Sequence, residues 1–198
     1  GLLQQGAEGW ALTWMDARID GVPVTQRAGK PVEVNALWLR ALDVTAELAP
    51  DAEDRERCRS MRAHAAESFV RRFARPDGRG LYDVVDGPGG DDASIRPNQL
   101  LAASLPSGPF DTDAARAVVE TCRSALLTPL GLRSLAPEDS RYRAHHQGSP
   151  AERDAAYHQG TVWPWLLGPY VDAARAVGIP VDLTGIEAHL GEWGLGSI

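Results

Sequence analysis

The residues best suited to chemistry gather within residues 12–38, where carboxylates, cations, an amide and tryptophans follow one another without a regular period. They are Trp14, Asp16, Arg18, Arg27, Lys30, Glu33, Asn35 and Trp38. Irregular backbone that leads into a helix is where binding and catalytic groups are commonly mounted. The apolar face of a pyranose stacks on an aromatic ring, and its hydroxyl groups require charged or amide partners. The pattern therefore indicates a sugar site.

Asp16 is the candidate acid of this stretch. Glycoside hydrolysis uses two carboxyl groups, one of which stays protonated near neutral pH and acts as the general acid. A neighbouring apolar ring such as Trp14 raises the pKa of a carboxyl group by desolvation. The alternative role is structural, with Asp16 paired to Arg18 or Arg27, and the residue types alone leave both roles open.

The composition excludes several other classes of protein. The 198 residues form one domain by size, with 43% hydrophobic and 24% charged residues, as in ordinary globular proteins. The formal net charge of −7 and the lack of clustered Lys and Arg argue against nucleic-acid and anionic-membrane partners. No apolar run reaches the length of a membrane span. Six tryptophans against three phenylalanines is unusual, and core filling competes with sugar stacking as the explanation.

Neither a metal nor a cofactor is expected. The acidic loop 86–92 lacks the alternating ligands and terminal Glu of a calcium loop. His145 and His146 are adjacent, so they point to opposite sides of any regular element, which is poor spacing for a metal. Cys58 and Cys122 fall on apolar helix faces, where buried thiols of a cytoplasmic protein are favoured over a disulfide.

The apolar spacing predicts two long helices that form an antiparallel hairpin. The first runs from Pro31 to Pro50, and the second is capped by Asp51 and stops at residues 75–78. The stripe expected on the first is Val34, Leu37, Ala41, Val44 and Leu48. The face expected on the second is Cys58, Met61, Ala65, Phe69 and Phe73.

Shorter helices separated by polar loops are predicted in the rest of the chain. One follows residues 94–100, one begins after Asp111 with Ala115, Val118, Cys122 and Ala125 inside, and a last one starts near Asp182. Residues 129–157 read as irregular, and residues 157–165 open a helix that Pro169 kinks and Gly178 ends. Apart from a candidate short strand at 81–85, no strand–helix alternation is present, so the expected class is all-α.

Four blocks of this sequence resemble a known family. They are Thr13–Ala17, Gly29–Trp38, Arg96–Gln99 and His158–Trp165, which in this order look like the C-terminal amylo-alpha-1,6-glucosidase domain of glycogen debranching enzymes. Glucoamylases and trehalases are more distant relatives of that family. The resemblance implies a toroid of six helical hairpins, an inverting mechanism, and α-1,6-linked branch points of glycogen-like glucans as substrate. It also implies a cytoplasmic enzyme of glycogen catabolism.

The resemblance assigns roles residue by residue. Asp16 matches the general acid of the family. The positions matching residues that line the sugar pocket are Trp14, Arg18, Lys30, Glu33, Asn35, Arg96, Asn98, His158, Trp163 and Trp165. The implied partners are an α-glucan substrate and the remainder of the same polypeptide.

The sequence departs from the family at two places. Gln26 stands where the family usually has Pro before the arginine, which loosens the loop. The family usually continues the Gly-Leu-Gly-Ser-Ile of residues 194–198 with Ser-Glu, and that Glu is the implied general base. Within the chain only Glu33 and Glu192 offer substitutes; Glu33 is better explained as a hydroxyl ligand, and Glu192 as a solvated residue.

These departures predict a chain that is incomplete as an enzyme. Residues 1–198 are expected to be the C-terminal part of a toroid domain, truncated at both ends, because only six or seven of the twelve helices are found. Such a partial toroid exposes apolar surface that its missing hairpins cover. The isolated chain is expected to be inactive, or nearly so.

Two other functions compete with this reading. A non-catalytic carbohydrate-binding or structural domain would keep the tryptophans but have no use for a desolvated Asp16. A related glycosidase of the trehalase or glucoamylase kind would share the fold and the acid, and would differ in its substrate.

Overall fold

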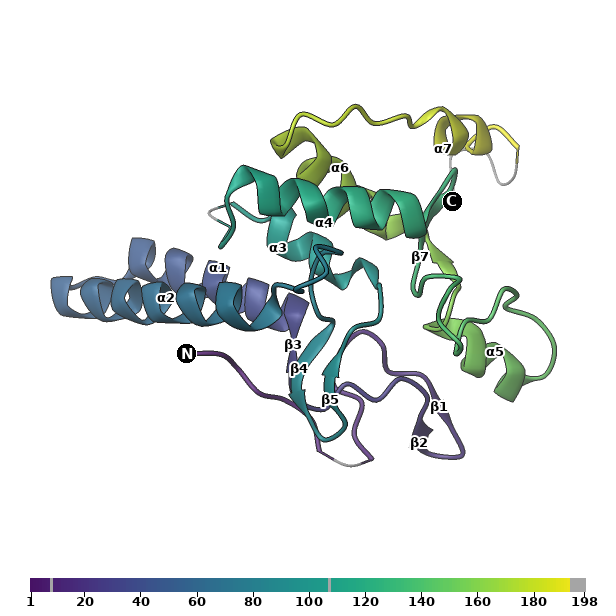
Figure 1. Ribbon diagram of the computed structural model, residues 1–198, viewed down its shortest axis with the longest axis horizontal. Helices are drawn as coiled ribbons and strands as arrows, with labels where there is room; N and C mark the ends of the chain where they lie inside the picture. Colours follow the sequence, from purple (N-terminus) through teal and green to yellow (C-terminus); the bar gives the residue numbers. More distant parts are fainter. Residues whose placement is uncertain (8, 107, 193–198) are drawn as a thin grey trace.

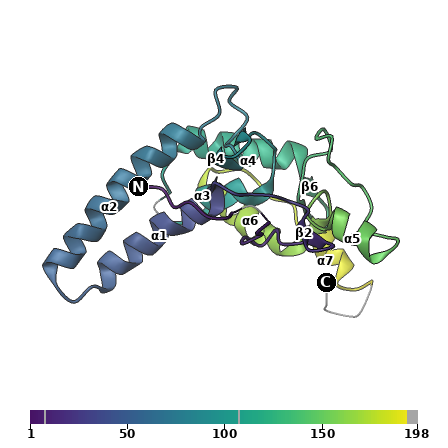
Figure 2. The ribbon, with the colours of Figure 1, turned by 90° about the horizontal axis from the view of Figure 1, so that it is seen from below.

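The computed structural model describes residues 1–7, 9–106 and 108–192, and its most extended part is a helical hairpin (Figure 1). Helices α1 (Val32–Leu48) and α2 (Ala52–Phe73) pack against each other along this hairpin, as predicted. The Asp51 side chain caps α2 by accepting a hydrogen bond from the backbone N–H of Asp54 at 2.8 Å. Figure 2 shows the hairpin extending away from the other elements.

The buried face of α1 is not the predicted stripe. The side chains that α1 buries are Val32, Glu33, Asn35, Ala36, Leu39, Leu42 and Ala46. Leu48 of the predicted stripe is 77% exposed and Leu37 is also exposed. Because α1 carries apolar residues on both sides, spacing alone does not decide which side faces the core. On α2 the prediction was correct for every residue except the exposed Met61.

A second group of helices packs on the base of this hairpin. Helix α3 (Leu100–Ser104) contacts α1, α4 (Thr112–Ala125) and α6 (Leu167–Ala176), so it lies at the centre of the helical core. The predicted inner face of α4 is confirmed, with Val118, Cys122 and Ala125 buried. No kink is required at Pro169, because it lies in the first turn of α6, where helical N–H groups have no partner.

The predicted all-α class, and with it the partial (α/α)6 toroid, is wrong. Of the described residues, 46% are helical and 13% lie in strands, which makes this part a mixed α/β fold with three small antiparallel sheets. Their strands are β1 (Arg18–Ile19) with β2 (Val22–Pro23); β3 (Lys30–Pro31), β4 (Val84–Gly87) and β5 (Gly90–Asp92); and β6 (Leu127–Thr128), β7 (Gly131–Arg133) and β8 (Val162–Trp163).

Strand length explains why the sequence indicated a single candidate strand, 81–85, which overlaps β4 at residues 84 and 85. Each strand has two to four residues, too few for an alternating apolar pattern to develop. Two pairings are also distant in sequence, since Pro31 faces Val84 and Leu132 faces Trp163. These sheets join the loops that hold the candidate site. Segments that were expected to be irregular are therefore connected to one another by backbone hydrogen bonds.

Helix α5 (Pro150–Tyr157) contradicts the expectation that residues 129–157 are irregular. Ser149 and Glu152 form a capping box at its start, with Pro150 in the first turn. This Ser-x-x-Glu pattern is a recognised start signal for a helix, so the information was present in the sequence. The last described helix, α7 (Thr184–His189), begins close to the predicted position.

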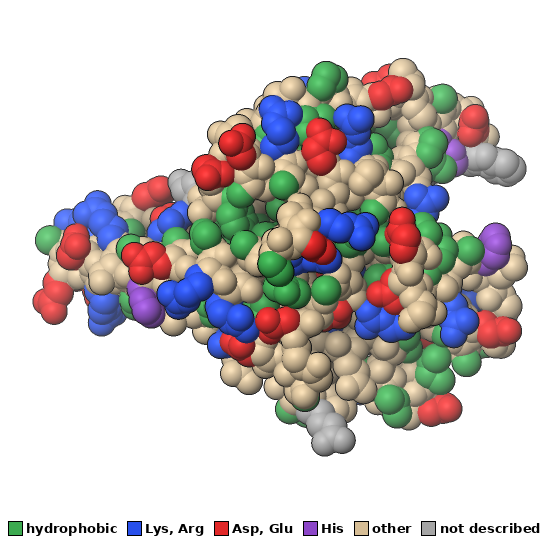
Figure 3. Space-filling view, viewed as in Figure 1, with side chains coloured by type: hydrophobic (Ala, Val, Ile, Leu, Met, Phe, Trp, Pro, Cys, Tyr) green, Lys and Arg blue, Asp and Glu red, His purple; other side chains and the backbone are tan. Residues whose placement is uncertain are grey.

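Two further sequence predictions concern the cysteines and the membrane. Cys58 and Cys122 are buried free thiols, as expected. Among the residues that the structure describes, no helix combines the length and the apolar character needed to cross a membrane. Figure 3 shows acidic and basic side chains interspersed over one face of the molecule.

The cap of α4 provides a first testable prediction. The Asp111 side chain accepts a hydrogen bond from the Ala114 N–H at 2.9 Å. We expect Asp111→Ala to lower the free energy of unfolding by about 1 kcal/mol, measured by urea denaturation. Asp113→Ala, which removes an acid from the same turn without removing the cap, is expected to cost less. Equal losses would contradict a specific capping role.

Candidate functional site

Aromatic rings from two distant parts of the chain meet at one place. Trp14 lies edge-on to His158, Trp163 and Trp165, with ring centroids 5.1, 5.9 and 5.2 Å away. Trp165 is 48% exposed, whereas Trp14 and Trp163 are half-buried. These rings, which we call the tryptophan cluster, therefore combine a packed base with an exposed aromatic surface of the kind on which sugars stack.

Asp16 lies beside this cluster, on the solvent side. Met15 is fully buried and Asp16 is exposed, so the backbone between them turns from the interior to the surface. The Asp16 charge reaches His158, whose pKa it raises against the larger effect of burial. The expected desolvation of Asp16 by Trp14 is not seen in this exposed carboxylate.

The two arginines that were candidates for a structural ion pair with Asp16 bind other groups. Arg18 donates hydrogen bonds to the carbonyl oxygens of Gly9 and Gly21, at 3.0 and 2.7 Å. Arg27 is buried, and its guanidinium binds Glu33 and Asp83. The structural alternative for Asp16 thus has no support from the hydrogen bonds of these two side chains.

Arg27, Glu33 and Asp83 form the centre of a buried ionic network. Arg27 makes a two-pronged ion pair with Glu33 and donates through Nε to Asp83 Oδ2 at 2.8 Å. Burial alone would lower the pKa of Arg27, but the charges of Asp83 and Glu33 raise it above its usual value. Glu33 is therefore held as the partner of a cation rather than directed at solvent.

A second buried arginine, Arg96, connects the network to the segment that carries His158. Its guanidinium donates to the carbonyl oxygens of Ser134 and His158, at 3.0 and 2.7 Å, and to the side chain of Gln159 at 2.8 Å. Its Nε lies 3.8 Å from Asp83 Oδ2. Burial lowers the pKa of Arg96, against the opposing effect of the Asp83 charge.

Asn98 joins the network to the tryptophan cluster. Its Nδ2 donates to Asp83 Oδ1 at 2.8 Å, and its Oδ1 accepts from Trp14 Nε1 at 2.7 Å. Asn98 and Arg96 flank Pro97 in the short 3-10 helix region Pro97–Gln99, which orients both side chains inward. The blocks at residues 13–17, 96–99 and 158–165 are therefore brought together.

Two other predicted site residues serve different parts of the structure. Asn35 exchanges hydrogen bonds with the backbone of Leu3 and donates to the Pro31 carbonyl, so it anchors the N-terminal segment on α1. Lys30 pairs with Asp86 at 2.6 Å, at the sheet of β3 and β4. Among the ten predicted sugar-pocket residues, those with exposed or half-buried side chains are Trp14, Arg18, Lys30, Trp163 and Trp165.

Three residues that the sequence analysis did not single out are central to this arrangement. Asp83 binds both arginines, Gln159 links Arg96 to the Thr25 hydroxyl, and Met15 places its sulfur 3.7 Å from Arg96 Nη1. A signal for Asp83 was available, since an isolated charge stands inside the apolar run 81–85. Such a charge is buried only when it is paired.

Two glycines allow loops to approach the cluster closely. Gly131 has φ +154°, and a Cβ there would lie 2.6 Å from the carbonyl oxygen of Trp163 on the paired strand. Gly160 has φ +145°, and a Cβ there would lie 2.2 Å from the Arg143 carbonyl oxygen. Both positions combine a backbone conformation that suits glycine with contacts that leave no room for a side chain.

The electrostatics of His158 predict a pH-dependent stability. Burial lowers its pKa from 6.5 to about 4, so the unfolded chain binds this proton more tightly than the folded chain. Stability is therefore lost as the pH falls from about 6.5 to about 4. We expect His158 to contribute a loss of about 3 kcal/mol between pH 7 and pH 4. The measurement is urea unfolding of the wild type and His158→Gln at several pH values.

Subtracting the stability of His158→Gln from that of the wild type at each pH separates the contribution of His158 from that of carboxylates, which titrate in the same pH range. The wild type is expected to lose more stability than His158→Gln by about 3 kcal/mol over this interval. Parallel pH profiles would show that the ring is not held neutral.

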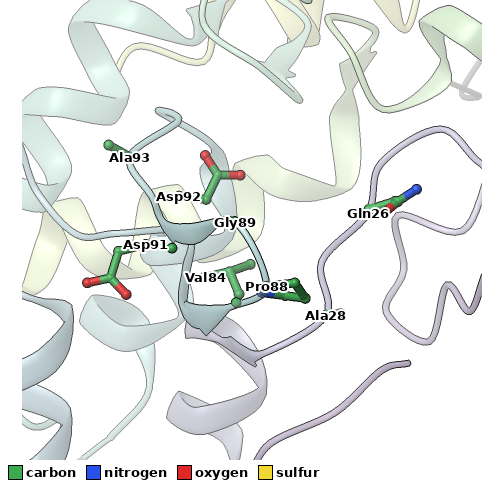
Figure 4. A pocket seen from close by; sticks show the side chains of 10 residues that line it. Gln26, Ala28, Val84, Pro88, Gly89, Asp91, Asp92 and Ala93 are labelled. Atoms are coloured by element: carbon green, nitrogen blue, oxygen red, sulfur yellow. The ribbon is translucent and has the colours of Figure 1, made fainter. Parts of the chain in front are cut away.

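A hollow beside the β4–β5 hairpin is separate from the tryptophan cluster. It has a volume of about 360 Å³ and lies between the segment of Gln26 and Ala28 and the turn Gly87–Ala93 (Figure 4). Asp91 and Asp92 are among its lining residues, and no tryptophan is. It lacks the aromatic and acid pairing on which the candidate site rests.

The second carboxylate of the expected pair is not identified within the described residues. Glu33 is held by Arg27, and Glu192 is an exposed residue that contacts His189 in the turn after α7. Residues 194–198, where the resemblance places the approach to the general base, lie outside the described residues. The described part thus presents one exposed carboxylate beside stacked and edge-on rings, which is one member of the carboxyl pair that glycoside hydrolysis uses.

Comparison with known proteins agrees with this class. The sequence profile of the amylo-alpha-1,6-glucosidase family matches residues 1–187, and the chain belongs to this family. The glycogen debranching enzyme of Saccharomyces cerevisiae is 26% identical over 216 aligned positions, which cover 87% of this chain. The alignment covers 14% of the yeast enzyme, so the chain spans a small part of that relative's length.

Proposed function

We propose that this chain contributes the acid side of a glycoside hydrolase site that cleaves α-1,6 branch points of glycogen-like glucans. Asp16 protonates the oxygen of the departing sugar, and the tryptophan cluster holds a glucose ring against its exposed surface. The reaction requires no metal or cofactor, and the α-glucan is the partner. This role belongs to cytoplasmic glycogen breakdown.

The observation that carries the proposal is the position of Asp16. An exposed carboxylate at the edge of packed tryptophans can reach a sugar that is stacked on the exposed ring of Trp165. Its charge is close enough to influence His158 within the same cluster. A domain that only bound sugar could use this carboxylate as a partner for a hydroxyl group, and loss of hydrolysis with retained binding in Asp16→Asn would separate the two roles.

The proposed mechanism is inverting, with a second carboxylate that activates a water molecule. The two carboxyl groups of such a pair are typically about 6.5–9.5 Å apart. Glu33 is a poor base because both its oxygens accept hydrogen bonds from Arg27. We therefore expect the base to come from outside the described residues, and the isolated 198-residue chain to be inactive.

A substrate panel tests the proposal. The full-length protein is expected to release glucose from a branched limit dextrin and from isomaltose-type α-1,6 linkages. It is expected to be much slower on linear maltooligosaccharides and on trehalose. Proton NMR of the first product should show β-glucose, the sign of inversion. Preferential trehalose or α-1,4 cleavage would replace the branch-point assignment with a trehalase-like or glucoamylase-like one.

The same panel tests the expected inactivity of the isolated 198-residue chain. Binding of a dextrin without hydrolysis is expected for the purified 198-residue chain. Hydrolysis by this chain at the rate of the full-length protein would overturn that part of the proposal.

A further inference from the structure

Asn98 has no free hydrogen-bonding group directed at solvent. It is 2% exposed, between the carboxylate of Asp83 and the indole of Trp14. Its amide orientation is fixed, because only Oδ1 can accept from the indole N–H and only Nδ2 can donate to the carboxylate. Its Nδ2 also lies 3.7 Å from the Met15 sulfur. Both polar ends of the side chain are therefore used inside the protein.

The partner that fixes Asn98 is itself rigidly held. Asp83 accepts hydrogen bonds from Arg27 Nε at 2.8 Å and Nη2 at 3.1 Å, and its backbone pairs with Val32 and Asp92. It is 2% exposed. An unbroken series of hydrogen bonds thus runs from the Arg27 ionic network through Asp83 and Asn98 to Trp14.

Trp14 connects Asn98 to the other rings of the site. Its ring is edge-on to three other rings, so a tilt of the indole changes its contacts with all of them. Asp16 is two residues away, and the intervening Met15 is fully buried. The Trp14 side chain and the Met15 side chain are the two inward anchors from which Asp16 projects.

We infer that Asn98 is a positioning residue that acts through Trp14 and does not contact the glucan. Asp83 orients its amide, and the amide sets the tilt of Trp14 and the direction of the Asp16 loop. The inference rests on the proposed function for its catalytic consequence. Its structural part, the restraint of residues 12–18, stands independently.

A double-mutant cycle in the full-length protein tests this role. Trp14→Phe removes the indole N–H and keeps an aromatic ring, whereas Asn98→Ala removes its acceptor. Each is expected to lower kcat/KM on a branched dextrin by about 10-fold, the equivalent of one buried hydrogen bond. Because both break the same bond, the double variant should lose little more than the worse single variant. The two single variants should also divide this loss between kcat and KM in the same way.

Gln99→Ala is the matched control. Gln99 is equally buried in the same 3-10 helix, but it accepts from the Leu81 N–H and donates to the Arg96 carbonyl. The effect of Gln99→Ala on kcat/KM is therefore expected to add to the effect of Trp14→Phe. Hydrogen–deuterium exchange, followed by mass spectrometry, should show faster exchange in residues 12–18 for Asn98→Ala and not for Gln99→Ala. Asn98→Ser is the second variant if Asn98→Ala does not fold.

The outcomes separate this inference from the proposed function. An additive Trp14–Asn98 cycle would overturn the inference, since it would mean that Asn98 acts on the substrate without Trp14. If the wild type does not cleave α-1,6 linkages, the proposed function fails, and the hydrogen–deuterium exchange measurement alone tests the positioning role of Asn98. Unchanged exchange in residues 12–18 of Asn98→Ala would then overturn the positioning role, and faster exchange would sustain it.

Discussion

Asp16→Asn in the full-length protein is expected to lower kcat for branch-point hydrolysis by about 10³-fold, within the range for loss of a positioned general acid. Asparagine has nearly the same shape and cannot donate the proton that the departing sugar requires. Because Asp16 is exposed and unpaired with Arg18 or Arg27, the variant should fold as the wild type does. The measurement is steady-state glucose release from a limit dextrin, together with dextrin binding.

A substrate that needs no proton separates the acid role from general damage. Fluoride leaves without protonation, so α-glucosyl fluoride should be hydrolysed by Asp16→Asn at a rate close to that of the wild type. The matched control is Asp20→Asn, which changes an exposed aspartate in the turn between β1 and β2. It should leave both reactions unchanged. Equal losses on dextrin and fluoride would rule out the acid role, and full dextrin activity would remove Asp16 from the mechanism.

The helices were largely predictable because local signals specify them. Asp51 and Asp111 marked helix starts that the structure confirms, and Phe69 and Phe73 lie on the predicted buried face. The side of α1 that faces the core was not predictable, because both of its sides are apolar and only tertiary packing selects one. The three sheets were not predicted, because their strands are short and their partners distant. Only the candidate strand at 81–85 overlaps an observed strand, β4, at residues 84 and 85.

The site was predictable in its residue types but not in its organisation. The residue types within residues 12–38 indicated a sugar site, and the resemblance placed Trp163 and Trp165 with Trp14 and Asp16. No local pattern shows that Arg27 pairs with Glu33 and Asp83. Arg27 lies in a loop, Glu33 at the start of a helix and Asp83 just before β4. Their pairing depends on the fold, which is why Asp83 was overlooked.

The second large effect is expected in stability, from the ionic network itself. Arg27→Met should lower the free energy of unfolding by about 3–5 kcal/mol, because it leaves Glu33 and Asp83 buried without their main counter-charge. Arg96 cannot replace it, since its Nε is 3.8 Å from Asp83. Urea unfolding of the purified chain measures the loss.

Arg72→Met is the matched control for this prediction. Arg72 also pairs with two carboxylates, Asp86 and Asp91, but at the surface, where such pairs contribute about 0–1 kcal/mol. A similar loss for both variants would contradict the distinction between buried and exposed pairs. A loss below about 1 kcal/mol for Arg27→Met would show that the network is not formed in solution.

The Arg27→Met variant also tests whether the network supports the site. Since Asp83 also holds Asn98, the variant should loosen the Asp16 loop as well, which joins the stability of the network to the geometry of the acid.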